Sequence, residues 1–150
     1  MQFQTEINSV LVVCKANYCR SPVAESILQM NCKEIDIDSA GLIPFHKNSM
    51  DQRSKKFLKR NNVASDIHIP KVITENLVST NNLILTMDFE VQTVLIKKFS
   101  KYSEKIYPFN FPDKRLLIRD PYLYSTIKEY EEVMSDINFL ASRWSELLNG

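Results

Sequence analysis

Residues 9–22 have the sequence SVLVVCKANYCRSP. The first five residues form a short, β-branched apolar run bounded by polar residues, which predicts a strand buried on both faces in a parallel sheet. Proline is tolerated in the first turn of a helix, so Pro22 predicts that a helix starts close to it. The segment from Cys14 to Arg20 therefore connects a strand to a helix. Ligands of open α/β sheets bind at such connections, beyond the carboxyl ends of the strands.

The rest of the chain continues the alternation of strands and helices. Residues 35–39 and 83–87 are further strand candidates, and residues 52–61 and 90–99 have the mixed periodicity of helices. This order predicts an α/β fold whose parallel strands are joined by right-handed crossovers. We expect a three-layer fold with a central, mainly parallel four-stranded sheet that is flanked by helices on both faces.

The C-terminal segment has the clearest helical pattern. Apolar residues recur every three or four positions from 127 to 148, which predicts a long helix with one buried face. Thr126 and Glu129 have the spacing of a capping box at its start, and Trp144 is expected to lie in the core. The basic residues of the segment 52–61 are instead expected to form a solvated helix face. They are Arg53, Lys55, Lys56, Lys59 and Arg60.

Length and composition fit one globular domain that spans residues 1–150. Nineteen basic and eighteen acidic side chains give a net charge of +1, so no bulk electrostatic attraction favours nucleic acid or an anionic membrane. The start of the chain is polar, and the longest apolar run, residues 10–14, is too short to span a bilayer. These features predict a cytoplasmic protein without membrane insertion.

The three cysteines are a poor framework for disulfide bonds, because their number is odd and all lie within the first quarter of the chain. Reduced thiols are therefore expected. The two histidines, His46 and His68, are far apart, and the chain has no Cys-x-x-Cys pair. We accordingly predict no metal site and no cofactor.

The segment from Cys14 to Arg20 has the features of an anion-binding loop. A helix N-terminus offers unpaired backbone N–H groups and the positive end of the helix dipole, which together bind phosphate. Arg20 adds a planar, charged fork that can bind two phosphate oxygens at once. Five residues separate Cys14 from Arg20, which lets the backbone wrap one tetrahedral anion above the sulfur of Cys14. These residues are Lys15, Ala16, Asn17, Tyr18 and Cys19.

The same positive environment favours a thiolate, so Cys14 is predicted to be a nucleophile. Ser21 can donate a hydrogen bond to that thiolate. The alternative is a structural role, because free cysteine is among the most buried residue types and a Cys-x5-Arg pattern also occurs by chance. The position after an apolar strand, with Ser21 and Pro22 opening a helix, favours the functional interpretation.

Several of these motifs resemble those of a known family. The stretch VVCKANYCRSPVAE at residues 12–25 looks like the phosphate loop of the low-molecular-weight protein tyrosine phosphatases. Matching motifs follow in chain order, and they are Asp38-Ser-Ala-Gly-Leu42, Asp51, His68, Met87-Asp88 and Asp120-Pro-Tyr122. The resemblance covers about residues 9–148. It is greatest to the bacterial branch that is paired with autophosphorylating tyrosine kinases of capsule and exopolysaccharide export.

The resemblance implies an enzyme that hydrolyses protein phosphotyrosine through a phosphocysteine intermediate. Cys14 is then the nucleophile, Arg20 the phosphate clamp, and Asp120, on a mobile loop, the general acid. A phenolate leaving group has a pKa of about 10, so its protonation in the transition state supplies ~10²–10⁴-fold in rate. The partner that this resemblance implies is a phosphotyrosine protein, in particular a tyrosine kinase, and we expect a monomer or a weak dimer.

The family also implies residues that support the loop. Asn17 and Ser39 resemble the two family residues that hold the loop in shape. His68 resembles the histidine that forms a hydrogen bond with the same asparagine. Ala16 stands where the family usually has glycine, and it is free of strain if the left-handed residue is Asn17. Lys15 is rare at its position.

Tyr18 stands where the family usually has an aliphatic or small residue. It is expected to form an aromatic-walled slot for the phosphotyrosine ring. The other walls of this slot are expected to be Phe45, Tyr122 and Tyr124.

Two other functions stay open. Arsenate reductases of the thioredoxin-coupled kind share the fold and the loop, but they relay a disulfide through two further cysteines in the second half of the chain. Here no cysteine follows Cys32. A phosphotyrosine-binding module without catalysis is the other alternative, if Lys15 and Ala16 disarm the loop.

Overall fold

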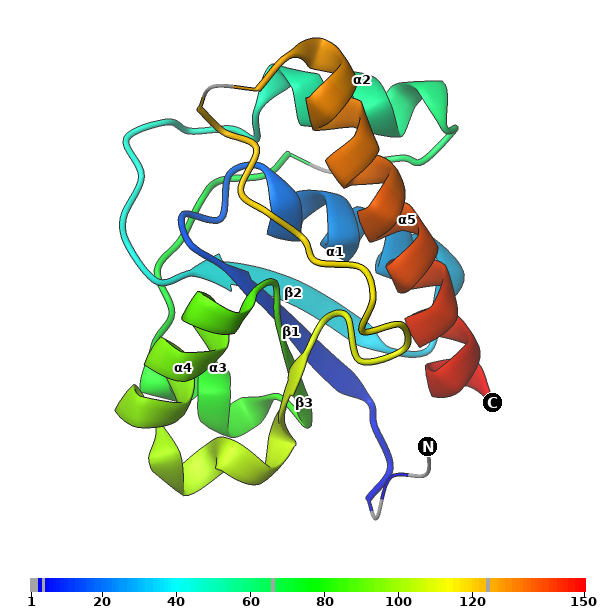
Figure 1. Cartoon of the computed structure of the whole chain (residues 1–150). Helices are drawn as coiled ribbons and strands as arrows, with labels where there is room; N and C mark the ends of the chain where they lie inside the picture. The colour runs from blue at the N-terminus through cyan, green and yellow to red at the C-terminus, as the bar shows by residue number, and fades with distance from the viewer. Residues whose placement is uncertain (1–2, 4, 66, 124) are drawn as a thin grey trace.

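A four-stranded parallel sheet lies at the centre of the protein (Figure 1). The computed structural model describes residues 3, 5–65, 67–123 and 125–150. The strand order across the sheet is β2-β1-β3-β4, and all three neighbouring pairs are parallel. The predicted fold class is therefore confirmed. The strands are β1 (Ser9–Cys14), β2 (Asp36–Gly41), β3 (Leu83–Thr86) and β4 (Ile106–Pro108).

Helices cover both faces of this sheet. On one side in Figure 1 lie α1 (Arg20–Asn31) and α5 (Ile127–Asn149), with α2 (Gln52–Arg60) packed against both. On the other side lie α3 (Glu75–Thr80) and α4 (Phe89–Lys98), followed by the short 3₁₀ helix η1 (Ser100–Lys105).

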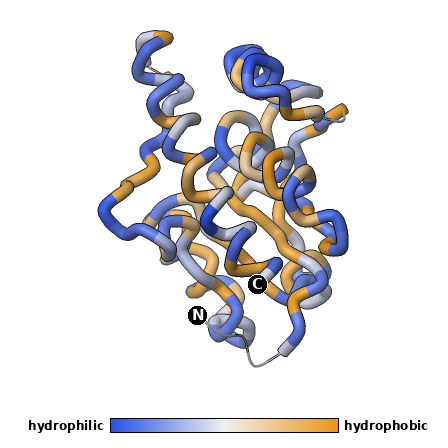
Figure 2. Tube along the Cα trace, turned by 90° about the vertical axis from the view of Figure 1, so that its right-hand side faces the viewer, coloured by the Kyte–Doolittle hydropathy of each residue, from blue (hydrophilic) through white to orange (hydrophobic). Residues whose placement is uncertain are grey.

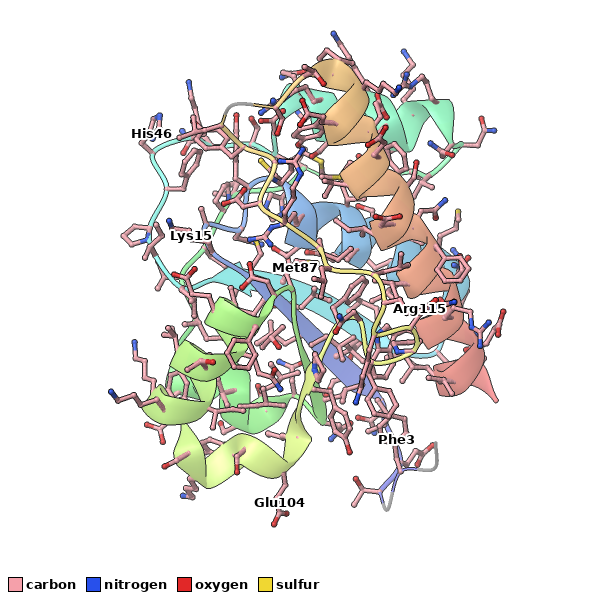
Figure 3. All side chains as sticks on the ribbon, viewed as in Figure 1. Phe3, Lys15, His46, Met87, Glu104 and Arg115 are labelled. Carbon is pink, nitrogen blue, oxygen red and sulfur yellow. The ribbon has the colours of Figure 1, made fainter. Side chains whose placement is uncertain are left out.

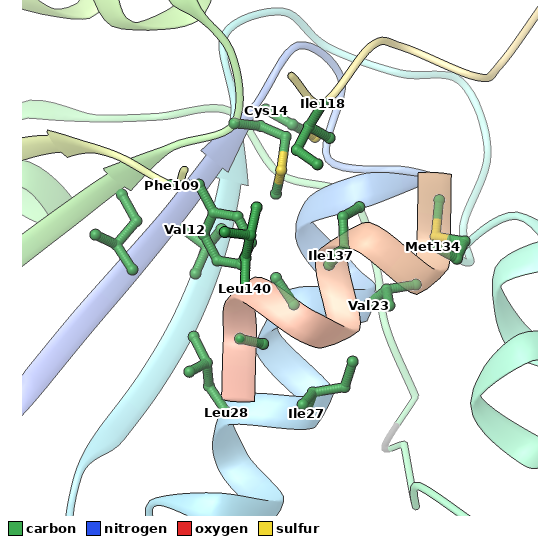
Figure 4. Close-up of a cluster of buried hydrophobic side chains, with 14 of the residues drawn as sticks. Val12, Cys14, Val23, Ile27, Leu28, Phe109, Ile118, Met134, Ile137 and Leu140 are labelled. Atoms are coloured by element: carbon green, nitrogen blue, oxygen red, sulfur yellow. The ribbon is translucent and has the colours of Figure 1, made fainter. Parts of the chain in front are cut away.

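The alternation of side chains along β1 explains the two cores. Val10 and Val12 face the core formed with α1 and α5, whereas Leu11 and Val13 face the core formed with α3 and α4. All four side chains are fully buried, as expected for a strand covered on both faces. Figure 2 shows apolar residues on these inner segments, and Figure 4 shows the first core, with Cys14 at one end of it.

The long C-terminal helix follows its sequence pattern closely. Thr126 and Glu129 form the predicted capping box, in which each side chain accepts a hydrogen bond from the other residue's backbone. Trp144 is fully buried, as predicted, and its indole N–H donates to the carbonyl oxygen of Phe109 at 2.7 Å. Ile127 departs from the apolar stripe, because at the first position of the helix it is largely exposed.

The strand order places the carboxyl end of β1 at a topological switch point. The chain leaves β1 for β2 on one side and returns to β3 on the other, so the connections diverge there. Ligand sites of open α/β sheets lie at such points. Cys14, the last residue of β1, occupies this place.

Within the described residues, none of the helices is both long enough and apolar enough to cross a membrane.

Candidate active site

A cavity of about 450 Å³ opens at the carboxyl end of β1. The loop between β1 and α1 forms its floor, and segments far along the chain form its walls. Its lining residues are Cys14, Lys15, Ala16, Tyr18, Cys19, Arg20, Ile43, Phe45, Asp120, Tyr122 and Leu123. Lys15 and His46 project to solvent on this side of the molecule (Figure 3). Ile43 and Leu123 are exposed apolar residues that directly follow matched motifs, and their place in the lining was not predicted from the sequence.

Asn17 holds the loop from its centre. Its φ of 55° places it in the left-handed region, and its side chain is fully buried. Ala16 does not have a positive φ, so the alanine that replaces the usual glycine brings no backbone strain of this kind. The Asn17 Oδ1 atom accepts from the backbone N–H of Lys71 at 3.1 Å, and the Asn17 carbonyl oxygen lies 2.8 Å from Nε2 of His68.

The two N–H bonds of the Asn17 amide are directed at two serines. Nδ2 donates to the hydroxyl oxygens of Ser21 and Ser39, at 2.8 Å in both cases. The Ser39 hydroxyl in turn donates to the carboxylate of Glu25. Burial raises the pKa of Glu25, although the Ser39 hydroxyl opposes that shift. Ser39 therefore joins the centre of the loop to α1.

The hydrogen-bond network determines how Ser21 meets the sulfur atom. Because the Ser21 oxygen already accepts from Asn17, its own hydrogen is available for Sγ of Cys14, 3.0 Å away. The backbone N–H of Asn17 also donates to this sulfur, at 3.2 Å. The sulfur thus accepts two hydrogen bonds, an arrangement suited to a thiolate, which accepts hydrogen bonds and donates none.

Arg20 is buried at the base of the cavity, with only 1% of its side chain exposed. Its Nη1 atom donates to Oδ2 of Asp88 at 2.7 Å and to the carbonyl oxygen of Ile118 at 3.1 Å. Asp88 also caps α4 by accepting from the backbone N–H of Val91. A buried guanidinium needs such a partner. The ion pair with Asp88 holds the Nη1 atom of Arg20 in place. Asp88 belongs to a motif that matches the family, but its contact with Arg20 was not predicted from the sequence.

Three aromatic rings form one wall of the cavity. The Tyr18 and Phe45 ring centroids are 4.3 Å apart, and the Tyr122 ring stands nearly perpendicular to both, at 5.6 Å and 5.5 Å. Tyr124, the fourth residue expected in this wall, lies outside the described residues.

Asp120 reaches the same cavity from the segment before α5. Its side chain is exposed to solvent. Its Oδ1 atom accepts from the backbone N–H of Tyr122 at 3.1 Å. The structure therefore brings Cys14, Arg20 and Asp120 to one cavity although Asp120 lies far from the loop in sequence.

Cys19 differs from Cys14 in its surroundings. Burial raises the pKa of the Cys19 thiol far above its ordinary value. The thiol donates to Oδ2 of Asp51 at 3.7 Å. A protonated, buried thiol is a poor nucleophile, so Cys19 is a structural member of the loop.

Gly41 allows the loop to approach β2. The backbone N–H groups of Leu42 and Ile43 donate to the carbonyl oxygens of Cys14 and Lys15. A Cβ atom at Gly41 would lie only 2.7 Å from the carbonyl carbon of Ala16. The absence of a side chain at this position is therefore a steric requirement of the loop.

We expect Gly41→Ala to displace the loop. Overpacking of this kind costs ~1–3 kcal/mol in the free energy of unfolding, and the moved amides should weaken binding of inorganic phosphate by at least about tenfold. Chemical denaturation and titration calorimetry measure the two effects. Unchanged phosphate affinity in the folded variant would show that the close approach of β2 does not shape the loop.

The fold and this loop define the class of protein. Residues 9–149 match the family model described as low molecular weight phosphotyrosine protein phosphatase. The chain belongs to this family of protein-tyrosine-phosphatases, and the family predicted from the sequence motifs is confirmed.

Similar proteins include bacterial members of the family. The chain is 30% identical to the low molecular weight protein-tyrosine-phosphatase Wzb of Escherichia coli K12, over 95% of this chain and 96% of Wzb. The crystal structure of the Erwinia amylovora tyrosine phosphatase AmsI superposes with a TM-score of 0.92 at 27% identity and covers 99% of each chain. The structure of Vibrio vulnificus Wzb in complex with benzylphosphonate gives a TM-score of 0.88 at 26% identity, over 95% of this chain and 99% of the other.

Proposed function

We propose that this protein hydrolyses phosphotyrosine in proteins through a phosphocysteine intermediate. The observation that carries the proposal is the hydrogen bonding of the Cys14 sulfur, which accepts from Ser21 and from the backbone N–H of Asn17 at the base of a cavity that Arg20 and Asp120 also line. A sulfur held in this way beneath an anion-binding loop is an activated nucleophile.

In the first step, the loop amides and Arg20 bind the phosphate dianion. Both contacts of Arg20 to Asp88 and Ile118 use Nη1, so Nε and Nη2 can bind two phosphate oxygens. The Cys14 thiolate attacks phosphorus, the S–P bond forms, and the bond from phosphorus to the tyrosine oxygen breaks. Asp120 in its acid form gives its proton to the leaving phenolate.

In the second step, water attacks the phosphocysteine. The Asp120 carboxylate takes a proton from this water, the S–P bond breaks, and inorganic phosphate is released. The electron pair returns to the sulfur of Cys14, where the Ser21 hydroxyl stabilises the departing thiolate. This step regenerates the starting enzyme without a metal ion.

The aromatic wall favours aryl phosphates. A phosphotyrosine ring can pack against the wall formed by Tyr18, Phe45 and Tyr122 while its phosphate reaches Cys14, whereas phosphoserine is too short to bring its phosphorus to the sulfur. The complex of Vibrio vulnificus Wzb with benzylphosphonate supports an aromatic ligand for this type of cavity.

The proposed substrate is an autophosphorylated bacterial tyrosine kinase of polysaccharide export. The resemblance of the sequence motifs to the bacterial branch supports this partner. A nucleophile that requires a reduced thiol suits the cytoplasm, and we propose that the protein acts there as a monomer or a weak dimer.

Hydrolysis of para-nitrophenyl phosphate in the presence of EDTA tests the proposed activity. We expect turnover that does not need a metal ion and that vanadate inhibits. A protein that binds phosphotyrosine peptides but does not turn over this ester would instead be a binding module.

A further inference from the structure

Arg53 joins two parts of the active site that are far apart in the sequence. It is the second residue of α2 and makes a two-pronged contact with Asp51, in which Nε and Nη2 lie 3.0 Å and 2.8 Å from the two carboxylate oxygens. The same Nη2 atom donates to the carbonyl oxygen of Tyr122 at 3.0 Å. Tyr122 belongs to the acid loop, which we define as residues 118–123.

One end of this connection is fixed to the phosphate loop. The backbone N–H of Asp51 donates to the carbonyl oxygen of Tyr18 at 3.0 Å, and the Asp51 carboxylate accepts from the thiol of Cys19. Burial by itself would raise the pKa of Asp51, but its pKa is lowered because Arg53 pairs with it. Asp51 is therefore a charged anchor for the guanidinium.

The guanidinium itself is held in place. The Arg53 Cζ atom lies 4.1 Å from the centre of the Tyr130 ring, in cation–π geometry. The Tyr130 hydroxyl lies 2.5 Å from that of Ser54, which donates to the carbonyl oxygen of Cys19. A planar fork with a paired carboxylate and a stacked face keeps one orientation.

Side-chain hydrogen bonds tie the acid loop to its surroundings at three described residues: Arg20 donates to the carbonyl oxygen of Ile118, Arg119 donates to Ser125 and Glu129, and Arg53 donates to the carbonyl oxygen of Tyr122. Residues 118–123 belong to no helix or strand, and the side chain of Asp120 is exposed. The backbone N–H of Tyr122 donates a hydrogen bond to the carboxylate of Asp120, and the carbonyl oxygen of Tyr122 accepts one from Arg53. Displacement of the Tyr122 backbone would therefore displace the side chain of Asp120.

Arg53 does not stabilise its own helix, α2. A cation in the first turn of a helix opposes the helix dipole, and α2 already has an N-cap in Asp51, which accepts from the backbone N–H of Arg53. The side chain thus gains its stabilisation from contacts outside its own helix.

From these contacts we propose that Arg53 is a positioning residue, which holds the Tyr122 carbonyl so that Asp120 stays in place to protonate the leaving group. The inference rests on the proposed function, because it concerns the general acid of that reaction. Arg53 acts through Asp120 and does not touch the substrate.

The test compares two substrates that differ in their need for the acid. Phenyl phosphate has a basic leaving group that requires a proton, whereas the 2,4-dinitrophenolate anion leaves without one. For Arg53→Met, which retains an unbranched side chain over Tyr130, we expect kcat/KM for phenyl phosphate to fall by roughly 10- to 100-fold. For 2,4-dinitrophenyl phosphate we expect a change of no more than about twofold.

Two controls separate positioning from folding. Arg60→Met removes another arginine of α2, one that pairs with Glu131, and it should leave the ratio of the two kcat/KM values unchanged. Arg53→Lys keeps the charge but not the fork, and it should shift the ratio in the same direction as Arg53→Met.

The decisive arm uses an Asp120→Ala background. If Arg53 acts through the acid, adding Arg53→Met to this variant should produce no further loss for phenyl phosphate. An additive loss, or an equal loss for both esters in the single variant, would overturn the inference while leaving the phosphatase activity intact. Absence of turnover in the wild-type protein would instead overturn the proposed function, and this inference with it.

Discussion

Replacement of Cys14 by serine is expected to reduce steady-state turnover of para-nitrophenyl phosphate on the order of 10⁴-fold or more. A serine hydroxyl is not ionised near neutral pH and has no base beside it, so it cannot replace the thiolate in repeated turnover. The loop amides and Arg20 remain, so inorganic phosphate should still bind. Stopped assays of nitrophenol release and titration calorimetry measure the two properties.

Cys32→Ser is the matched control for this change. Cys32 is also a buried free thiol, but it lies at the end of α1, away from the cavity lining. The control should retain turnover. If Cys14→Ser turned over substrate at the rate of the control, the sulfur at position 14 would not be the nucleophile.

Replacement of Asp120 by alanine is expected to slow cleavage of phenyl phosphate by ~10²–10⁴-fold in kcat/KM. The leaving phenolate has a pKa of about 10 and departs poorly without a proton. Substrate binding should change little, because the proposed phosphate contacts belong to the loop and Arg20. The measurement is kcat/KM for a series of aryl phosphates whose phenols differ in acidity.

In this series, the loss should shrink as the leaving phenol becomes more acidic. Asp113→Ala offers a control on the same segment, since Asp113 pairs locally with Arg115 and does not line the cavity. A loss of the same size for every ester would assign Asp120 to binding or folding and not to proton transfer.

The sequence was sufficient to predict features that are local along the chain. The β1 strand, the loop from Cys14 to Arg20 and the start of α1 follow one another directly, so the position of the Cys-x5-Arg pattern between an apolar strand and a helix indicated an anion-binding loop. The capping box of Thr126 and Glu129 and the apolar period of α5 are local in the same sense. These features depend on backbone geometry over a few residues, which composition and order determine.

Other features depend on contacts between distant residues and were not predicted. The pair between Arg20 and Asp88 joins residues 68 positions apart. The strand β4 has three residues, too few for a two-residue period to stand out. The requirement for glycine at position 41 arises from the approach of Ala16, which only the packed sheet creates.

Arg53 illustrates the same limit. The basic pattern of residues 52–61 predicts a solvated helix face that includes Arg53, but the side chain of Arg53 is only 27% exposed. Its contacts to Asp51 and to the Tyr122 carbonyl become visible only when α2 and the acid loop are seen together. Sequence pattern identifies a charged face, but not which of its members has a partner.

Trapping of the covalent intermediate tests the central claim most directly. The enzyme is mixed with para-nitrophenyl phosphate, quenched in acid during turnover, digested and analysed by mass spectrometry. The proposed mechanism predicts one phosphoryl group on the peptide that contains Cys14, attached to that sulfur, and none in Cys14→Ala. Rapid turnover without phosphate on Cys14, or with phosphate on another residue, would contradict it.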